Sequence, residues 1–272
     1  MQANPVVDTI TIYPVKSLDG ISLQKAQIGN GGCLMHDREY AIVDSIGKFV
    51  KGKNNDLVYL LRSKIDFENE IISFRHESTD VWNSFHLQKN TTAINEFLSS
   101  FFKMPVTLIR NTQGEFLDIP VQSGVTVLSN ASLQTVGAWF NDMDIEEIRK
   151  RFRATIEISG VPAFWEDKLF LEEGTAIEFK IGEVTLYGIS PRARCVVPTR
   201  NPQTGELLHG FSKIFAQQRT QTLPQWSTLT DYGHAYYLSV DCYIPLTEFG
   251  KWIAVGEELT VTGKKTFPTF TQ

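Results

Sequence analysis

The chain has 272 residues, 42% hydrophobic and 21% charged, which fits a soluble globular protein of one large or two small domains. Its formal net charge of −5 gives no support to a nucleic-acid partner or a membrane-surface role, and no run of about 18 uncharged apolar residues predicts a membrane span. The first residues carry no secretory signal, and three cysteines far apart in the sequence argue against disulfides, so we expect a cytoplasmic protein.

The first third of the chain is rich in predicted strands. Residues 6–13 are largely β-branched, and clusters of glycine and asparagine, which tolerate the positive φ of tight turns, separate the later apolar runs. Residues 91–102 break this pattern, because apolar side chains recur every three or four residues from Ile94. We therefore predict a helix at 91–102 and strands at 6–13, 21–26, 40–43, 71–74 and 81–87.

Residues 111–123 are polar and turn-rich, which makes them the best candidate boundary. Beyond them, 125–128 is typical of a buried strand that enters a helix through a Ser129–Asn130 cap. Helices are further predicted at 145–151 and 211–218, and strands at 155–158, 176–181, 184–189, 195–199, 236–244 and 258–262. Many short strands, few helices and no βαβ rhythm predict a mainly β fold with some helix (α+β), built as an antiparallel barrel or sandwich.

Cys195 is the strongest candidate for chemistry. It ends the segment Pro191-Arg192-Ala193-Arg194-Cys195, and cationic neighbours favour the thiolate, the form that binds metals or attacks electrophiles. The alternative is that Cys195 is a small buried apolar residue. Arg200 opens a polar loop near the same place. We expect Cys33 to be accessible in a glycine-rich turn and Cys242 to be buried on a strand face, so neither is a ligand candidate.

Other polar residues stand at predicted strand ends. Lys16 and Ser17 follow the first strand, Arg38 precedes the strand at 40–43, and Arg153 precedes the strand at 155–158. Each cation can be a solvated strand end or part of an anion clamp. Ser129 and Asn130 can be a simple helix cap, or they can mark a helix N-terminus that presents its N–H groups to a phosphate.

Several of these pieces occur together in the order found in a known family. The segments are Tyr13-Pro14-Val15-Lys16-Ser17, Asp37-Arg38, Arg151-Phe152-Arg153, Ile158-Ser159-Gly160, Trp165-Glu166-Asp167 and Arg194-Cys195. In their order and spacing, from about residue 6 to residue 262, they resemble MOSC-domain proteins with an N-terminal β-barrel extension, such as amidoxime-reducing components and bacterial reductases of N-hydroxylated bases. This resemblance implies two β-barrel-like units, an N-terminal one at 1–110 and a MOSC barrel at 124–265, joined by 111–123.

The resemblance also implies a function. It places a pterin-based molybdenum cofactor between the two units, with Cys195 as the ligand of the metal and the catalytic residue, which agrees with the preference of thiolates for soft metals. The residues expected to hold the cofactor are Lys16, Ser17, Arg38, Ser129, Asn130, Arg153, Arg194 and Arg200. The implied activity is the reduction of N-hydroxylated small molecules with electrons from a separate ferredoxin- or flavoprotein-type donor.

The chain departs from that family at three places. Ala193 stands where relatives commonly have serine, Ala154-Thr155 follows Arg153 in place of proline and asparagine, and Lys168-Leu169 replaces the usual tryptophan. Two rival interpretations therefore stay open. One is a carrier that holds the cofactor, or a persulfide on Cys195, without turnover; the other is a cofactor-free scaffold in which Cys195 is simply buried.

Overall fold

The largest element of the fold is an eight-stranded sheet. The computed structural model describes residues 4–112, 116–118, 124–141 and 143–266. In spatial order the sheet contains β15 (Leu259–Thr266), β11 (Thr175–Ile181), β12 (Val184–Ala193), β13 (Tyr237–Tyr243), β9 (Val125–Ser129), β10 (Ile156–Ser159), β1 (Val6–Ile12) and β2 (Ile21–Leu23). The mainly β prediction is confirmed. Within the described strands no sheet closes into a barrel, although one antiparallel bridge, Val6 to Glu258, connects β1 with the start of β15.

One pair of strands in this sheet is parallel. Val127 of β9 lies opposite Ile156 of β10, because α2 (Asn130–Ala138) and α3 (Ile145–Phe152) carry the chain back between the two strands. The absence of a repeated βαβ pattern did not reveal this one crossover, in which two short helices connect the parallel strands. The other ladders of the sheet are antiparallel, and its buried face is filled by aliphatic side chains such as Ile10, Val127 and Val240.

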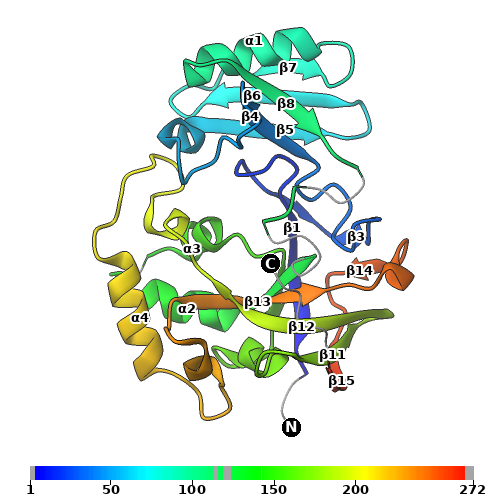
Figure 1. Ribbon diagram of the computed structural model, residues 1–272, viewed down its shortest axis with the longest axis vertical. Helices are drawn as coiled ribbons and strands as arrows, with labels where there is room; N and C mark the ends of the chain where they lie inside the picture. Colours follow the sequence, from blue (N-terminus) through cyan, green and yellow to red (C-terminus); the bar gives the residue numbers. More distant parts are fainter. Residues whose placement is uncertain (1–3, 113–115, 119–123, 142, 267–272) are drawn as a thin grey trace.

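A smaller unit lies beside the large sheet, at the top of Figure 1. It pairs β4 (Tyr40–Asp44) with β8 (Val106–Arg110), and it adds a sheet of β5 (Leu61–Asp66), β6 (Ile71–His76) and β7 (Asn83–His86). The helix α1 (Thr91–Phe102) covers the outer side of this unit (Figure 1). Leu98 and Phe74 are fully buried within it, so the unit has a hydrophobic core of its own.

The domain boundaries at 1–110 and 124–265 stay a prediction. β1 and β2 come from the first range but belong to the large sheet, and β3 (Lys25–Gln27) pairs with β14 (Trp252–Ala254) from the second. Of the connecting segment 111–123, the structure describes 111–112 and 116–118, and the remainder lies outside the described residues.

The three helices of the larger unit meet in an aromatic cluster. Phe211 and Phe215 of α4 (Phe211–Gln221) pack against the end of α3, with the Phe211 and Phe152 ring centroids 6.2 Å apart. The Phe140 ring stacks on Phe211 at 4.2 Å. These contacts fix the C-terminal end of α3, which carries Arg151, Phe152 and Arg153. None of the helices in the described ranges is long and apolar enough to cross a membrane.

The predicted strand at 195–199 was wrong. β12 ends at Ala193, and Val197–Thr199 forms the short 3-10 helix η3 with Pro198 in its first turn. The physical reason is that Pro198 has no N–H to donate to a strand ladder but suits the first turn of a helix. The sequence prediction also missed β5, β8 and β14. The polar run of β5 and the three-residue β14 become strands only through their pairing partners, whereas β8 has the apolar, β-branched sequence typical of a strand.

Candidate functional site

The segment that follows β1 turns sharply and buries a lysine. The backbone N–H of Lys16 donates to the carbonyl of Tyr40 at 2.7 Å, which ties the segment to β4. Burial lowers the pKa of Lys16, and its ammonium donates to the carbonyl of Phe116 at 2.6 Å and to Asp118 Oδ1 at 2.5 Å. Ser17 has a φ of 72°, a backbone conformation that residues other than glycine rarely adopt. Its hydroxyl forms no hydrogen bond with a described residue.

Asp118 joins Lys16 to a second cation. Its Oδ2 lies 3.3 Å from the guanidinium of Arg192 on β12, which also donates to Asp241 at 2.6 Å. Partial burial alone would raise the pKa of Asp118, but the attraction of Lys16 and Arg192 holds it below its ordinary value. The side chain of Asp118 remains 56% exposed. A solvent-accessible carboxylate therefore accepts hydrogen bonds from both Lys16 and Arg192.

Two arginines share the ring of Tyr13. The guanidinium carbons of Arg38 and Arg153 lie 4.8 Å and 3.9 Å from its centroid. Arg38 also pairs with the buried Asp37, whereas Arg153 has no carboxylate partner among the described residues, and burial lowers its pKa. Both arginines have left-handed backbones, with φ of 55° and 54°. Such conformations cost about 1–3 kcal/mol for residues other than glycine and often occur at functional sites.

The C-terminal end of α3 holds the Cys195 segment on both sides. Before the cysteine, the Arg194 guanidinium donates to the carbonyl of Phe152, which the helix end leaves without a backbone donor. After it, the buried Arg151 donates to the carbonyls of Pro198 at 2.8 Å and Arg200 at 2.6 Å. The thiol is therefore presented by a loop that is fastened at two points.

Cys195 itself is half-buried, whereas Cys33 and Cys242 are fully buried. The expectation that Cys33 is accessible was wrong, because its turn packs inside the protein. The Cys195 Sγ accepts from the N–H of Val197 at 3.5 Å, at the start of η3. The pKa of Arg194 falls to about 10 through burial and the nearby Arg192, while the Cys195 thiol opposes this fall. The thiol therefore lies within the field of both arginines.

A tyrosine from the smaller unit reaches the same place. Burial raises the pKa of Tyr59 to about 12, and the charges acting on it include Arg200, Cys195 and Arg153. Its hydroxyl donates to the carbonyl of Gly52 at 3.2 Å, and a Cβ at Gly52 would lie 2.6 Å from that hydroxyl oxygen. Tyr59 therefore lies within the electrostatic field of Arg200, Cys195 and Arg153, although its hydrogen bond is to Gly52 in the smaller unit.

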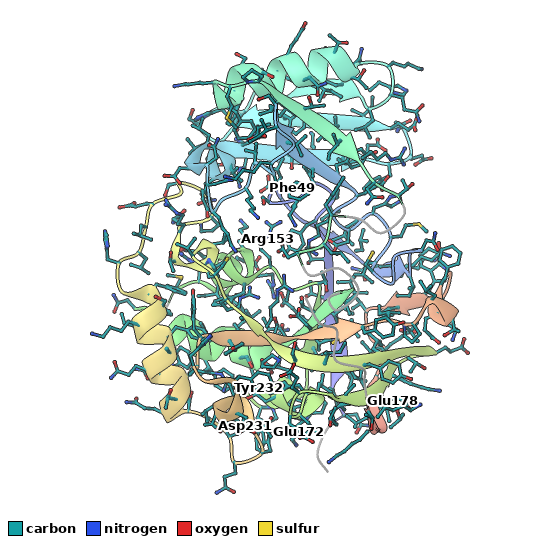
Figure 2. The ribbon with its side chains drawn as sticks, viewed as in Figure 1. Phe49, Arg153, Glu172, Glu178, Asp231 and Tyr232 are labelled. Atoms are coloured by element: carbon teal, nitrogen blue, oxygen red, sulfur yellow. The ribbon has the colours of Figure 1, made fainter. Side chains whose placement is uncertain are left out.

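Figure 2 shows Arg153 between the smaller unit and the large sheet, with Phe49 above it. The Lys16 ammonium lies 5.5 Å from the Phe49 ring centroid, which places it in the same region. A small polar cavity of about 10 Å³, large enough for about one water molecule, is lined by Arg38, Asp118, Thr126, Thr155 and Arg192, among others. We call Lys16, Arg38, Arg153, Arg192 and Arg194 the cationic cluster.

Two of the predicted cofactor residues lie elsewhere. Ser129 is at the far end of β9 from Thr126, and its hydroxyl accepts from the N–H of Ser132 at 3.1 Å as the cap of α2. Asn130 donates to Asp8 at 2.7 Å, near the start of β1. The structure thus brings together Lys16, Arg38, Arg153, Arg194 and Cys195, with Ser17 and Arg200 next to them, but not Ser129 and Asn130.

Sequence reasoning missed the roles of Tyr13, Tyr59 and Asp118 in the site. The signal for Tyr13 was its place three positions before Lys16, in a segment already singled out. Nothing in the neighbours of Asp118 marks it, since its two cations come from residues far away in the sequence. Tyr59 lies in a different unit from the thiol, so only the packing of the two units reveals it.

Comparison with known proteins gives a family for the first part of the chain. Residues 4–105 match the MOSC N-terminal beta barrel domain, which confirms the sequence resemblance for this part of the chain. A molybdenum cofactor sulfurase from Homo sapiens is 22% identical over 264 residues, covering 79% of this chain and 29% of the relative. One from Oryza sativa subsp. japonica is 22% identical over 299 residues, covering 92% and 35%. The chain thus spans about a third of the length of these relatives.

Among solved structures, the YUAD protein from Bacillus subtilis aligns with a TM-score of 0.41 and 13% sequence identity, covering 96% of this chain and 97% of that one.

Proposed function

We propose that this chain, which carries the MOSC N-terminal beta barrel domain, binds a molybdenum cofactor at the cationic cluster, with Cys195 as the thiolate ligand of the metal. The observation that carries the proposal is a cluster of five cations that, among the described residues, has only Asp37, Asp118 and Asp241 as ion-pair partners and that includes Arg192 and Arg194 near the half-buried thiol of Cys195, in a protein whose overall charge is negative. An anionic, phosphate-bearing ligand explains this local excess of positive charge. A soft metal explains the thiol within it.

The residues present fit such a ligand. Arg200 Nε is buried without a hydrogen-bond partner, and Arg153 lacks a carboxylate among the described residues, so both have donors to offer. The described ranges contain no group of three histidine, cysteine or acidic residues that could hold a metal. A metal at Cys195 would therefore bring most of its ligands with it, as the metal of a pterin cofactor does.

Different residues would bind the anionic end of the cofactor and its metal. Lys16, Arg38 and Arg153 would hold the anionic end of the cofactor, and Cys195 would bind the metal near Arg192 and Arg194. When bound, the cofactor supplies two-electron redox chemistry. The chain orients it through α3, which fastens the thiol loop at Arg194 and Pro198.

For the reaction we propose reduction of an N-hydroxylated small molecule. Two electrons and two protons convert R–NH–OH into R–NH₂ and water, and a separate ferredoxin- or flavoprotein-type protein delivers the electrons. The cysteines cannot form an iron–sulfur cluster of their own, because Cys33 and Cys242 are buried in other parts of the fold. The same charge and sequence arguments lead us to propose a cytoplasmic protein.

A second candidate is a role in handling the cofactor or its sulfur. The relatives named above are molybdenum cofactor sulfurases, and a half-buried thiol held in a cationic site could carry a persulfide. In that case the chain would bind the same ligand without turning over an N-hydroxylated substrate.

Metal analysis of protein purified from a molybdenum-replete host tests the shared part of both candidates. We expect close to one molybdenum per wild-type chain, and much less in Cys195→Ala and Arg153→Ala. Equal, low occupancy in all three would refute cofactor binding. If the metal is present, an assay of several N-hydroxylated substrates with an artificial electron donor separates the reductase from the carrier. Turnover supports the first, and its absence across the set supports the second.

A further inference from the structure

Tyr13 contacts the chain beside two members of the cationic cluster, Arg38 and Arg153, through its backbone and through its side chain. Its N–H donates to Asp37 Oδ1 at 2.7 Å, and its carbonyl accepts from the N–H of Arg38 at 2.9 Å. On the other side, its hydroxyl lies 3.4 Å from the carbonyl of Ala154, the residue after Arg153. The ring is buried, with only 4% of the residue exposed. Tyr13 thus contacts the chain beside each arginine.

The ring also contacts the charges themselves. The guanidiniums of Arg38 and Arg153 lie within 4.8 Å and 3.9 Å of its centroid, close enough for cation–π attraction. Two like charges brought this close repel each other, and Arg38 contributes to the lowered pKa of Arg153 after burial, the larger cause. The electron-rich face of the ring offsets part of this repulsion, together with the more distant carboxylates of Asp19 and Asp37, neither of which forms an ion pair with Arg153.

We propose that Tyr13 is a positioning residue of the cationic cluster and that its ring holds Arg38 and Arg153 in place before the ligand binds. This inference rests on the proposed function, since it assumes that the two arginines bind an anionic group. A site whose donors are ordered beforehand loses less freedom on binding and therefore binds more tightly. Without the ring, Arg38 would still be paired with Asp37, but Arg153 would have to be ordered by the ligand, against its repulsion by Arg38.

The experiment measures pyrophosphate binding by titration calorimetry to the purified full chain. Tyr13→Phe keeps the ring and removes the hydroxyl, whereas Tyr13→Leu keeps apolar volume and removes the ring. The matched control is Tyr232→Leu, because Tyr232 is also partly buried but lies at the opposite end of the larger unit from Arg153 (Figure 2). Molybdenum content of each purified variant is a second readout that does not depend on activity.

We expect pyrophosphate to bind about tenfold more weakly to Tyr13→Leu, the change implied by losing two partly desolvated cation–π contacts. Tyr13→Phe and Tyr232→Leu should bind within about twofold of wild type. The rescue by phenylalanine separates positioning by the ring from a general loss of packing. If Tyr13→Leu binds as tightly as wild type, the positioning role is overturned while the proposed function stands. If wild type binds neither pyrophosphate nor molybdenum, the proposed function falls, and this role falls with it.

A spectroscopic measurement decides the case in which Tyr13→Leu does not fold. In nitrogen-15 spectra of wild type and Tyr13→Phe, the Nε–H protons of Arg38 and Arg153 should show ring-current shifts that change when pyrophosphate is added. Resonances at ordinary arginine positions in both proteins would overturn the proposal, because the ring would then not hold the guanidiniums in solution.

Discussion

The ammonium of Lys16 and the carboxylate of Asp118 lie 2.5 Å apart, although 102 residues separate them in the chain. The lysine is almost fully buried and the aspartate is more than half exposed, so the pair crosses the boundary between protein and solvent. A second carboxylate oxygen of Asp118 reaches Arg192. The carboxylate therefore takes up donors that a bound phosphate would use.

From this pair we predict that Asp118→Asn strengthens anion binding. Removing the charge frees Lys16 and Arg192 and raises the local positive potential, so pyrophosphate should bind several-fold more tightly. Asp231→Asn makes the same change in net charge far from the site (Figure 2) and should leave the affinity unchanged. Titration calorimetry of the three proteins checks this. Weaker binding by Asp118→Asn would show that the carboxylate organises the cations rather than competing with the ligand.

The three thiols should differ in reactivity. Cys195 is half-buried in a cationic loop, Cys33 is fully buried, and burial raises the pKa of Cys242 well above its ordinary value. We expect a thiol reagent such as iodoacetamide to modify Cys195 in the native protein many times faster than the other two. Mass spectrometry of a time course, repeated on Cys195→Ser, measures the rates. Comparable labelling of Cys242 in folded protein would contradict the buried packing described above.

Arg153→Gly should separate folding from binding. Glycine adopts a φ of 54° without strain, so the substitution removes about 1–3 kcal/mol of backbone strain while it loses a cation–π contact of about 0.5–2 kcal/mol. We therefore expect a melting temperature within a few degrees of wild type, but pyrophosphate binding at least about tenfold weaker. Arg75→Gly, with Arg75 also over an aromatic ring but in the smaller unit, serves as the comparison. A collapse of stability in Arg153→Gly would argue that this arginine is structural.

Because of Glu166, we expect the free energy of unfolding to fall as the pH rises. Burial, with a smaller effect of the neighbouring Asp167 charge, raises its pKa to about 7, above the ordinary value near 4.5. A raised carboxyl pKa means that the folded state holds its proton more tightly. Its contribution is therefore favourable at low pH and is lost between about pH 4.5 and pH 7.

We predict that Glu166→Gln is more stable than wild type at pH 8, by at most about 2–3 kcal/mol, and that the difference shrinks toward pH 5. The side chain accepts a hydrogen bond from Ser132 at 2.9 Å, which a glutamine oxygen can also accept. Denaturant unfolding at both pH values measures it, and Glu172→Gln, at an exposed position, controls for net charge. An equal difference at pH 5 and pH 8 would contradict the raised pKa.

Local patterns were enough to predict much of the fold. The spacing of apolar residues from Ile94 placed α1 at 91–102, and the Ser129 cap placed the start of α2. These predictions succeeded because hydrophobic periodicity and capping act within a few residues. The predicted strand at 195–199 was wrong because the prediction gave more weight to the β-branched Val196 and Val197 than to Pro198, which favours the start of a helix. β5 was missed because its polar sequence becomes a strand only next to β6.

The site was predicted in part for a similar reason. Motif order identified Lys16, Arg38, Arg153 and Cys195, and the structure brings them together. Positive φ at Ser17, Arg38 and Arg153 leaves no mark in a sequence, because none of these residues is glycine. Asp118 reaches its partners only through the fold. The helix N-terminus at Ser129 matched a phosphate-site pattern, but its place on β9 puts it at the far end of the strand from the cations.

X-ray absorption at the molybdenum edge tests the central claim most directly, because it counts the sulfur neighbours of the metal. The measurement compares wild type with Cys195→Ser, each purified from a molybdenum-replete host. We predict that wild type shows one more molybdenum–sulfur contact than any metal retained by Cys195→Ser, whose occupancy is also lower. An unchanged sulfur shell at equal occupancy would contradict the assignment of Cys195 as the metal ligand.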